Sequence, residues 1–240
     1  AGLITLGIAP GDRVGILSEN RVEWPIADLG ILSAGAADVT MHAPLSADQV
    51  EYQLGHSEAR GVLVSNQDQA DKVIARLDDL PDLEFLVSFE SVTLPESRLL
   101  QLSWQGLCHR GARASLDDQI ASREQALDSS SLATLIYTSG TTGNPKGVQY
   151  EHRSTLLHAL AGLQPSTFNF TASSVMLPVV PMFHAASWGL PYAGAMAGIK
   201  FVFSAVNDPA VLDEVMKTEK VTDSAGVPTV WLAHFQYCDA

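Results

Sequence analysis

Short apolar runs alternate with amphipathic stretches from the start of the chain to about residue 90. The apolar runs predict buried strands at 12–17, 37–42, 61–65 and 83–89. The stretches between them carry apolar residues at helical spacing and predict helices at 22–35, 46–57 and 67–80. Ser46 is an N-cap candidate for the second of these helices, and Pro81 ends the third. Strands that alternate with helices form βαβ units, so the pattern predicts an α/β fold with parallel-rich sheets and helices on both faces.

Residues 90–131 break this alternation because they are polar and rich in turn-forming residues. They predict one helix near 97–110 within a long excursion between two subdomains. The regular pattern then resumes, with strands expected at 132–139, 175–180 and 200–205 and helices near 151–163, 187–197 and 208–221. We therefore expect a first α/β subdomain at 1–131 and an incomplete second one at 132–240.

Charge and cysteine content narrow the class of protein. The formal net charge is −13, which argues against a broad nucleic-acid surface. Hydrophobic residues make up 46% of the chain and charged residues 17%, which predicts a globular interior rather than disorder. The two cysteines, Cys108 and Cys238, form no CxxC pattern, so we expect two ordinary, partly buried thiols in a reducing, cytoplasmic setting. No apolar run approaches the roughly 18 residues of a membrane span, and no signal peptide is evident.

The stretch TSGTTGNPKG at 138–147 joins an expected strand to an expected helix. Gly140, Gly143 and Gly147 permit backbone conformations in which N–H groups can surround phosphate oxygens. Hydroxyl groups are available from Thr138, Ser139, Thr141 and Thr142. Lys146 adds a mobile positive charge, and the expected helix would add the positive end of its dipole. The stretch has neither the Walker A spacing nor GxGxxG, so its chemistry alone leaves both a polyphosphate site and an ordinary flexible turn open.

The order of residues in YTSGTTGNPKGV resembles the phosphate loop of the adenylate-forming family, which includes acyl-CoA synthetases, peptide-synthetase adenylation domains and luciferases. Further similarity covers nearly the whole chain and is weakest over 90–131. The segment VPMFHAASWGLPY is most similar to medium- and long-chain fatty acyl-CoA synthetases, although Ala186 stands where those enzymes usually have Asn. The resemblance implies part of the large N-terminal domain of the adenylate-forming fold, without the C-terminal domain that carries a catalytic lysine.

The resemblance also implies roles for individual residues. Lys146 and His184 would be catalytic, with Lys146 on the phosphates and His184 positioning the carboxylate. The residues that bind ATP would be Thr138, Ser139, Gly140, Thr141, Thr142, Gly143 and Lys146. The acyl substrate would contact His184, Trp188, Gly226, Val227, Pro228 and Thr229. No metal site made of protein side chains is expected, because the other histidines show no HExxH or paired spacing. Mg²⁺ would arrive with ATP, where Thr141 or Thr142 could contact it.

The implied activity is that of a fatty acid–CoA ligase. ATP would activate a fatty carboxylate as an acyl-adenylate, and coenzyme A would then take the acyl group as a thioester. We expect these 240 residues alone to be inactive, because the family's ribose-binding, magnesium-binding and catalytic-lysine segments are not among them. The expected partners are the carboxylate, ATP and coenzyme A, with a homodimer allowed for a longer parent chain. Adenylation of an aryl or amino acid, a non-catalytic nucleotide-binding remnant and a generic Rossmann-like binding domain stay open as alternatives.

Overall fold

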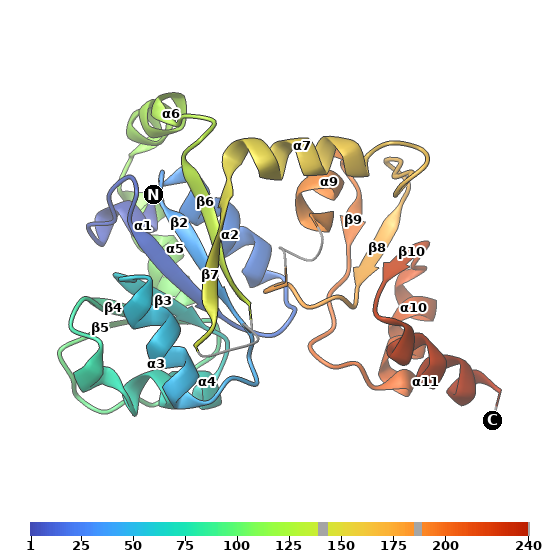
Figure 1. The fold of residues 1–240 in the computed structure, drawn as a ribbon, viewed down its shortest axis with the longest axis horizontal. Helices are drawn as coiled ribbons and strands as arrows, with labels where there is room; N and C mark the ends of the chain where they lie inside the picture. The colour runs from blue at the N-terminus through green and yellow to red at the C-terminus, as the bar shows by residue number, and fades with distance from the viewer. Residues whose placement is uncertain (139–143, 185–188, 240) are drawn as a thin grey trace. The chain divides into compact units, whose positions relative to one another are not determined.

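The computed structural model describes residues 1–138, 144–184 and 189–239, which fall into two compact units (Figure 1). Unit 1 comprises Ala1–Ser18 and Glu23–Arg153, and unit 2 comprises Glu19–Val22 and Ser154–Ala240. The chain therefore divides after Arg153 rather than after residue 131, the boundary expected from the sequence. The reason is that two further strands, which follow residue 131, pair with the sheet of unit 1.

Unit 1 is built on a seven-stranded sheet with the order β5-β4-β3-β1-β2-β6-β7. Its strands are β1 (Arg13–Leu17), β2 (Ala37–Met41), β3 (Gly61–Val64), β4 (Phe85–Ser88), β5 (Leu100–Ser103), β6 (Leu132–Thr138) and β7 (Lys146–Glu151). All neighbouring pairs are parallel except β6 and β7, which run antiparallel. Strands β2, β3 and β4 are buried at every residue, as expected where helices cover both faces of a sheet. The predicted α/β architecture is confirmed.

Helices cover both faces of this sheet (Figure 1). They are α1 (Gly2–Thr5), α2 (Glu23–Ser33), α3 (Ala47–His56), α4 (Gln67–Ile74), α5 (Trp104–Arg113) and α6 (Asp117–Ala126), with a 3-10 turn, η1, at Leu77–Asp79. Helices α3 and α4 lie on one face, and α2 and α5 lie on the other. On the first face, Val50, Leu54 and Val73 belong to one buried cluster with Leu17 and Val39 of the sheet. Each such buried side chain contributes about 1.5–3 kcal/mol of hydrophobic stabilisation.

The beginning of α3 follows the sequence prediction. Ser46 Oγ accepts a hydrogen bond from the N–H of Gln49 at 3.3 Å, and Gln49 Oε1 accepts one from the N–H of Ser46 at 3.0 Å. This capping box satisfies two backbone donors that the helix itself leaves free. The single helix predicted at 67–80 is instead α4 followed by η1, because the backbone leaves the helical region at Arg76 (φ −123°, ψ 16°).

Residues 90–131 contain more regular structure than predicted. Strand β5 pairs with β4, α5 begins directly after it, and α6 follows. The helix predicted near 97–110 is present as α5 from Trp104 onward, but β5 takes the place of its beginning. A four-residue strand with two leucines gives almost no periodic signal, so β5 was not predicted. Its hydrogen bonds come from pairing with β4, which is a tertiary contact. Ser103 then caps α5, since its Oγ accepts a hydrogen bond from the N–H of Gly106 at 3.1 Å.

Unit 2 contains a three-stranded parallel sheet with the order β10-β8-β9. Its strands are β8 (Val175–Pro178), β9 (Lys200–Phe201) and β10 (Asp223–Ala225), and its helices are α7 (His152–Gly162, which starts in unit 1), α9 (Leu190–Ala197), α10 (Pro209–Glu219) and α11 (Pro228–Cys238). Strand β9 is shorter than the predicted 200–205. Leu177, Val179 and Leu212 form the buried centre of one cluster. Within the described residues, no helix is both long enough and apolar enough to cross a bilayer.

Candidate functional site

The flanks of the predicted phosphate loop are the ends of two antiparallel strands. Strand β6 ends at Thr138 and β7 begins at Lys146, and these two residues are register partners across the pair. Both are exposed, so a hydroxyl and an ammonium group meet the solvent at the same end of the hairpin. The other predicted loop residues, Ser139, Gly140, Thr141, Thr142 and Gly143, lie outside the described part of the chain.

The prediction that a helix follows the loop directly was wrong. Strand β7 intervenes, and α7 begins only at His152. The segment KGVQYE pairs with β6 along its whole length, and Val148 and Tyr150 are residue types that favour strands. A helix dipole therefore cannot act at Lys146 in the way that the sequence suggested. The positive charge of Lys146 and the backbone N–H groups remain the candidates for holding phosphate.

Two side chains of α3 bind the two flanks of the loop. The hydroxyl of Tyr52 donates to the carbonyl oxygen of Pro145 at 3.1 Å, just before Lys146. His56 Nδ1 and the hydroxyl of Tyr137 form a hydrogen bond of 2.8 Å, just before Thr138. Burial, with a smaller contribution from Tyr52, raises the pKa of Tyr137 to about 12, so its hydroxyl stays protonated at neutral pH. These contacts fix both ends of the loop to one helix.

Sequence reasoning missed Tyr52 and His56. Their i,i+4 spacing places both on one face of α3, which is a readable signal. Nothing in the sequence indicates that this face meets the flanks of the loop, because the contact depends on β6 lying beside β2 in the sheet.

The environment of Lys146 leaves its ammonium group available to a ligand. Its side chain is exposed, and among the residues that the structure describes no carboxylate forms an ion pair with it. Other lysines of the chain are paired, for example Lys200 with Glu219 at 2.5 Å. An unpaired ammonium group beside a hydroxyl-rich loop suits a polyanion.

In unit 2, the predicted acyl-site segments follow neighbouring parallel strands. Pro178 at the end of β8 is the register partner of Ala225 at the end of β10. The N–H groups of Val179 and Val180 both donate to the carbonyl oxygen of Ala225, at 2.8 and 2.9 Å. The segment that leads to His184 is therefore brought beside the segment that begins at Gly226. Side-chain sites commonly form where the carboxyl ends of parallel strands meet.

The predicted acyl-site residues differ in exposure. His184 is exposed, with its ring centroid 6.1 Å from that of Phe183. Trp188 lies outside the described residues. Val227 and Thr229 are exposed, and Pro228 is the first residue of α11.

A glycine at position 226 leaves room for the indole ring of Trp231. A Cβ at this position would lie 3.0 Å from the indole of Trp231, and Trp231 Nε1 donates to the carbonyl oxygen of Gly226 at 3.0 Å. The close approach that a glycine permits is thus made by the indole ring. This contact explains the glycine without an acyl chain.

Asn20 is the residue of this region that sequence reasoning missed. Its Nδ2 donates to the carbonyl oxygens of Pro178 and Val180, each at 2.9 Å, and its Oδ1 accepts from the N–H of Met182 at 2.7 Å. The side chain is buried, with 9% exposure. The amide therefore fixes the backbone immediately before His184. A single Asn in a loop carries no sequence signal for such a role.

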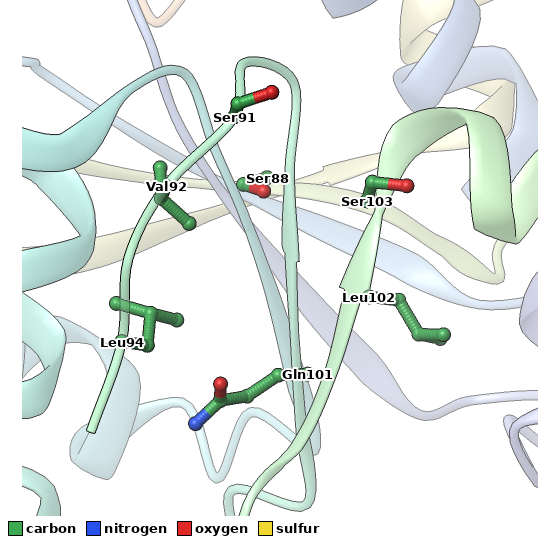
Figure 2. A pocket seen from close by; sticks show the side chains of 7 residues that line it. All are labelled: Ser88, Ser91, Val92, Leu94, Gln101, Leu102 and Ser103. Carbon is green, nitrogen blue, oxygen red and sulfur yellow. The ribbon is translucent and has the colours of Figure 1, made fainter. Parts of the chain in front are cut away.

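Unit 1 also has a hollow near the carboxyl ends of β4 and β5 (Figure 2). Its lining residues are Ser88, Ser91, Val92, Leu94, Gln101, Leu102 and Ser103. None of these side chains is an acid, a base or a cation. In the sheet, β3, β1 and β2 separate β4 from β6, so the hollow does not adjoin the flanks of the loop. It adds no chemistry to the candidate site.

Known proteins match this chain over nearly its whole length. A family model described as "AMP-binding enzyme" matches residues 1–239. A medium-chain-fatty-acid–CoA ligase from Ectopseudomonas oleovorans is 34% identical over 230 residues, which cover 94% of this chain and 40% of that protein. A long-chain-fatty-acid–CoA ligase from Thermus thermophilus is 35% identical over 240 residues, which cover 100% of this chain and 42% of that protein. The chain thus spans less than half the length of these curated relatives.

A solved structure gives the same picture of the fold. The inhibitor-bound N-terminal domain of FACL13 from Mycobacterium tuberculosis superposes with a TM-score of 0.76 at 26% identity. The match covers 98% of this chain and 54% of that chain. Nearly all of the described α/β architecture therefore has a counterpart in that domain.

Proposed function

Because this chain belongs to the AMP-binding enzyme family, we propose that it contributes the polyphosphate-binding part of an ATP-dependent fatty acid–CoA ligase. In the reaction, a fatty carboxylate attacks the α-phosphate of ATP, which gives an acyl-adenylate and releases pyrophosphate. Coenzyme A then displaces AMP and forms the thioester. ATP and coenzyme A are thus co-substrates, and the family membership supports both.

The observation that carries this proposal is the hairpin end at which Thr138 faces an unpaired Lys146. Lys146 would neutralise charge on the β- and γ-phosphates as pyrophosphate leaves, which is electrostatic stabilisation of the transition state. The hydroxyl of Thr138 can donate a hydrogen bond to a phosphate oxygen. The hydroxyl of Thr141 or Thr142 would contact Mg²⁺ bound to the phosphates, because hydroxyl and phosphate oxygens suit this hard cation.

The acyl side of the site is assigned by the same proposal. His184 would hold the carboxylate, Trp188 would border the acyl chain, and Gly226–Thr229 would line the acyl pocket. Asn20 supports this assignment because it fixes the backbone before His184. The choice of a fatty substrate rests on the two fatty-acid ligases that match almost the whole chain.

Calorimetric titration of the purified chain with ATP and with AMP tests the phosphate assignment. We expect Lys146→Ala to weaken ATP binding at least about tenfold, because a hydrogen bond between charged groups contributes about 1.5–3 kcal/mol. AMP lacks the β- and γ-phosphates, so its affinity is expected to change by less than about twofold.

Lys220→Asn is the matched control, because it removes one positive charge from unit 2 at a residue with φ 55°, a conformation that asparagine tolerates. It should leave both affinities unchanged. If Lys146→Ala and Lys220→Asn bind ATP equally well, or if Lys146→Ala weakens ATP and AMP to the same extent, Lys146 does not hold the outer phosphates. Absence of ATP binding to the unmodified chain would also overturn the assignment.

A further inference from the structure

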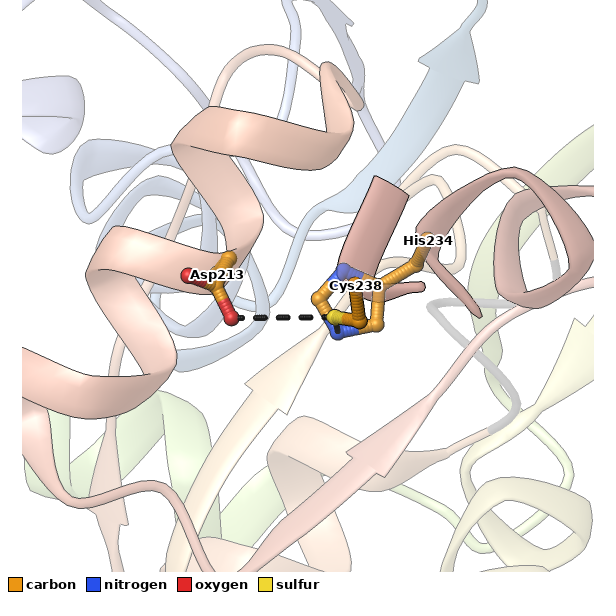
Figure 3. Close-up of side chains that lie close together, drawn as sticks. All are labelled: Asp213, His234 and Cys238. Carbon is orange, nitrogen blue, oxygen red and sulfur yellow. Dashed lines mark hydrogen bonds between the residues drawn. The ribbon is translucent and has the colours of Figure 1, made fainter. Parts of the chain in front are cut away.

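Three side chains that could bind a metal ion meet on two helices of unit 2 (Figure 3). Asp213 comes from α10, and His234 and Cys238 come from successive turns of α11. Cys238 Sγ lies 3.6 Å from His234 Nε2 and 3.9 Å from Asp213 Oδ1. One candidate ligand atom from each residue lies within 4.8 Å of the other two. A thiol, an imidazole and a carboxylate thus converge on one point.

The spacing on α11 explains why two of these groups meet. Residues four apart lie on the same face of a helix, so His234 and Cys238 point to the same side. Helices α10 and α11 are packed against each other, and this brings Asp213 from a distant part of the sequence to the pair. The sequence predicted no metal site and two partly buried thiols. Neither prediction took account of the His-x-x-x-Cys spacing of His234 and Cys238. Both cysteines are exposed, so the prediction of partly buried thiols was wrong.

The distances fit a tetrahedral ion. Zinc binds sulfur at about 2.3 Å and nitrogen or oxygen at about 2.0 Å, so two tetrahedral ligands lie about 3.3–3.6 Å apart. The separations of 3.6 and 3.9 Å from Cys238 Sγ are near this range, and all three ligand atoms lie within 4.8 Å of one another. Binding of an ion would draw the three groups together by side-chain rotation.

The surroundings orient the ligands. Lys217 Nζ binds Asp213 Oδ2 at 2.6 Å, which leaves Oδ1 directed at Cys238. Contacts of this kind commonly hold metal-binding carboxylates in place. His234 is 9% exposed, and its Nδ1 is buried with no hydrogen-bond partner among the described residues. Its Nε2 faces the sulfur, so Nε2 is the nitrogen that could bind a metal.

We propose that Asp213, His234 and Cys238 form a binding site for Zn²⁺, with the fourth position open to water or to an external ligand. Thiolate and imidazole ligands favour Zn²⁺ over Mg²⁺, which prefers oxygen alone. The site is therefore distinct in chemistry from the magnesium that accompanies ATP. The ion joins α10 to α11 and stabilises unit 2.

The test is a titration of the purified, chelator-treated chain with Zn²⁺ and, as a spectroscopic probe, with Co²⁺. We expect one equivalent of Zn²⁺ to bind and Co²⁺ to produce a thiolate-to-cobalt charge-transfer band. Cys238→Ser should abolish that band, and Asp213→Asn should weaken Zn²⁺ binding at least tenfold. Cys108→Ser is the matched control, because Cys108 is the other exposed thiol and belongs to unit 1.

The variants at Cys238 and Cys108 alter exposed side chains, so both are expected to fold, and circular dichroism checks this. A band that persists in Cys238→Ser, or that disappears in Cys108→Ser, would overturn the proposal. So would failure of the unmodified chain to bind Zn²⁺ more tightly than Cys238→Ser does. None of these outcomes depends on ATP binding, so the zinc site can fail while the phosphate assignment holds, and the reverse.

Discussion

Units 1 and 2 both combine parallel strands with helices, yet different contacts stabilise them. In unit 1, β2, β3 and β4 are buried at every residue under helices on both faces. In unit 2 the strands have four, two and three residues, and none of the residues of β9 and β10 is fully buried. Unit 1 therefore depends mainly on burial of apolar surface, whereas individual hydrogen bonds carry more weight in unit 2.

Helices α7 and α11 of unit 2 are also less completely covered than α3 and α4 of unit 1. Large side chains exposed on α7 and α11 are Leu156, Leu157, Leu160, Leu232, Phe235 and Tyr237. On α3 and α4 of unit 1, by contrast, Val50, Leu54 and Val73 are at most 1% exposed. An α/β pattern in a sequence thus predicts which elements form, and the number and length of the strands decide how well those elements are covered.

The largest effect in this comparison is expected from Asn20→Ala in unit 2. The substitution removes the three hydrogen bonds that the buried Asn20 side chain makes to the backbone. Each hydrogen bond contributes about 0.5–1.5 kcal/mol, so unit 2 should lose on the order of 3 kcal/mol. Hydrogen exchange followed by mass spectrometry should show loss of protection over 175–182, with β1 to β4 unchanged.

Asn207→Ala is the matched control, since Asn207 is an exposed asparagine of unit 2. We expect a change within about 0.5 kcal/mol for it. Equal exchange in the two variants would mean that the bonds of Asn20 add nothing to unit 2. The contrast with the apolar stabilisation of unit 1 would then fail.

In unit 1, the corresponding substitution is Gly61→Ala, which tests how tightly the core is packed. A Cβ at this position would lie 2.0 Å from the ring of Phe85, its register partner on β4. Overpacking of a buried sheet costs about 1–3 kcal/mol, and a urea unfolding curve measures it. Gly30→Ala on α2 has open space around its new methyl group and should stabilise by up to about 1 kcal/mol. If Gly61→Ala unfolded at the same urea concentration as the unmodified chain, the core of unit 1 would be less tightly packed than described.

The interior of unit 1 also contains two carboxyl groups. Asp38 on β2 and Asp28 on α2 are both fully buried. Burial, followed by the charge of Asp28, raises the pKa of Asp38 well above its ordinary value, while Thr134 lowers it slightly. Burial also lowers the pKa of the neighbouring His152, partly offset by Asp28.

The smallest expected effect concerns the carboxyl group of Asp38. A raised folded-state pKa means that Asp38 favours the folded state below its unfolded pKa of about 4, and this contribution is lost as pH rises through the folded pKa. Asp38→Asn should therefore stabilise unit 1 at pH 7 and change its stability little at pH 3. The half-buried His152 gives a slope of opposite sign, so the difference between variant and unmodified chain is the quantity to measure.

Urea unfolding at several pH values provides that difference. Asp82→Asn, at an exposed position of unit 1, is the control and should be neutral throughout. A pH-independent difference for Asp38→Asn would show that Asp38 ionises alike in the folded and unfolded chain.

The sequence was most informative where a pattern is local. Strands β1 to β4 are short, mainly apolar runs, and Ser46 stands directly before its helix, so both were predicted. The order of residues in the phosphate loop indicated the family, which the match over residues 1–239 confirms. Strand β7 was missed because KGVQYE acquires its structure by pairing with β6.

Contacts between distant segments could not be predicted in the same way. Tyr52 and His56 share a helix face, but their partners belong to a hairpin far along the chain. Two of the three proposed zinc ligands, His234 and Cys238, were readable from their spacing. Asp213 was not, because only the packing of two helices brings it there.

The bonds of Asn20 also have a consequence for the order of events during protein synthesis. Its partners are 158 to 162 residues further along the chain. At about 5–20 residues per second, a ribosome adds them on the order of ten seconds after Asn20 has been made. Strand β7, which completes the sheet of unit 1, ends at Glu151 and emerges earlier. The sheet of unit 1 can therefore form during translation. Glu19–Val22, between β1 and α2, stays solvated until the last third of the chain has been synthesised.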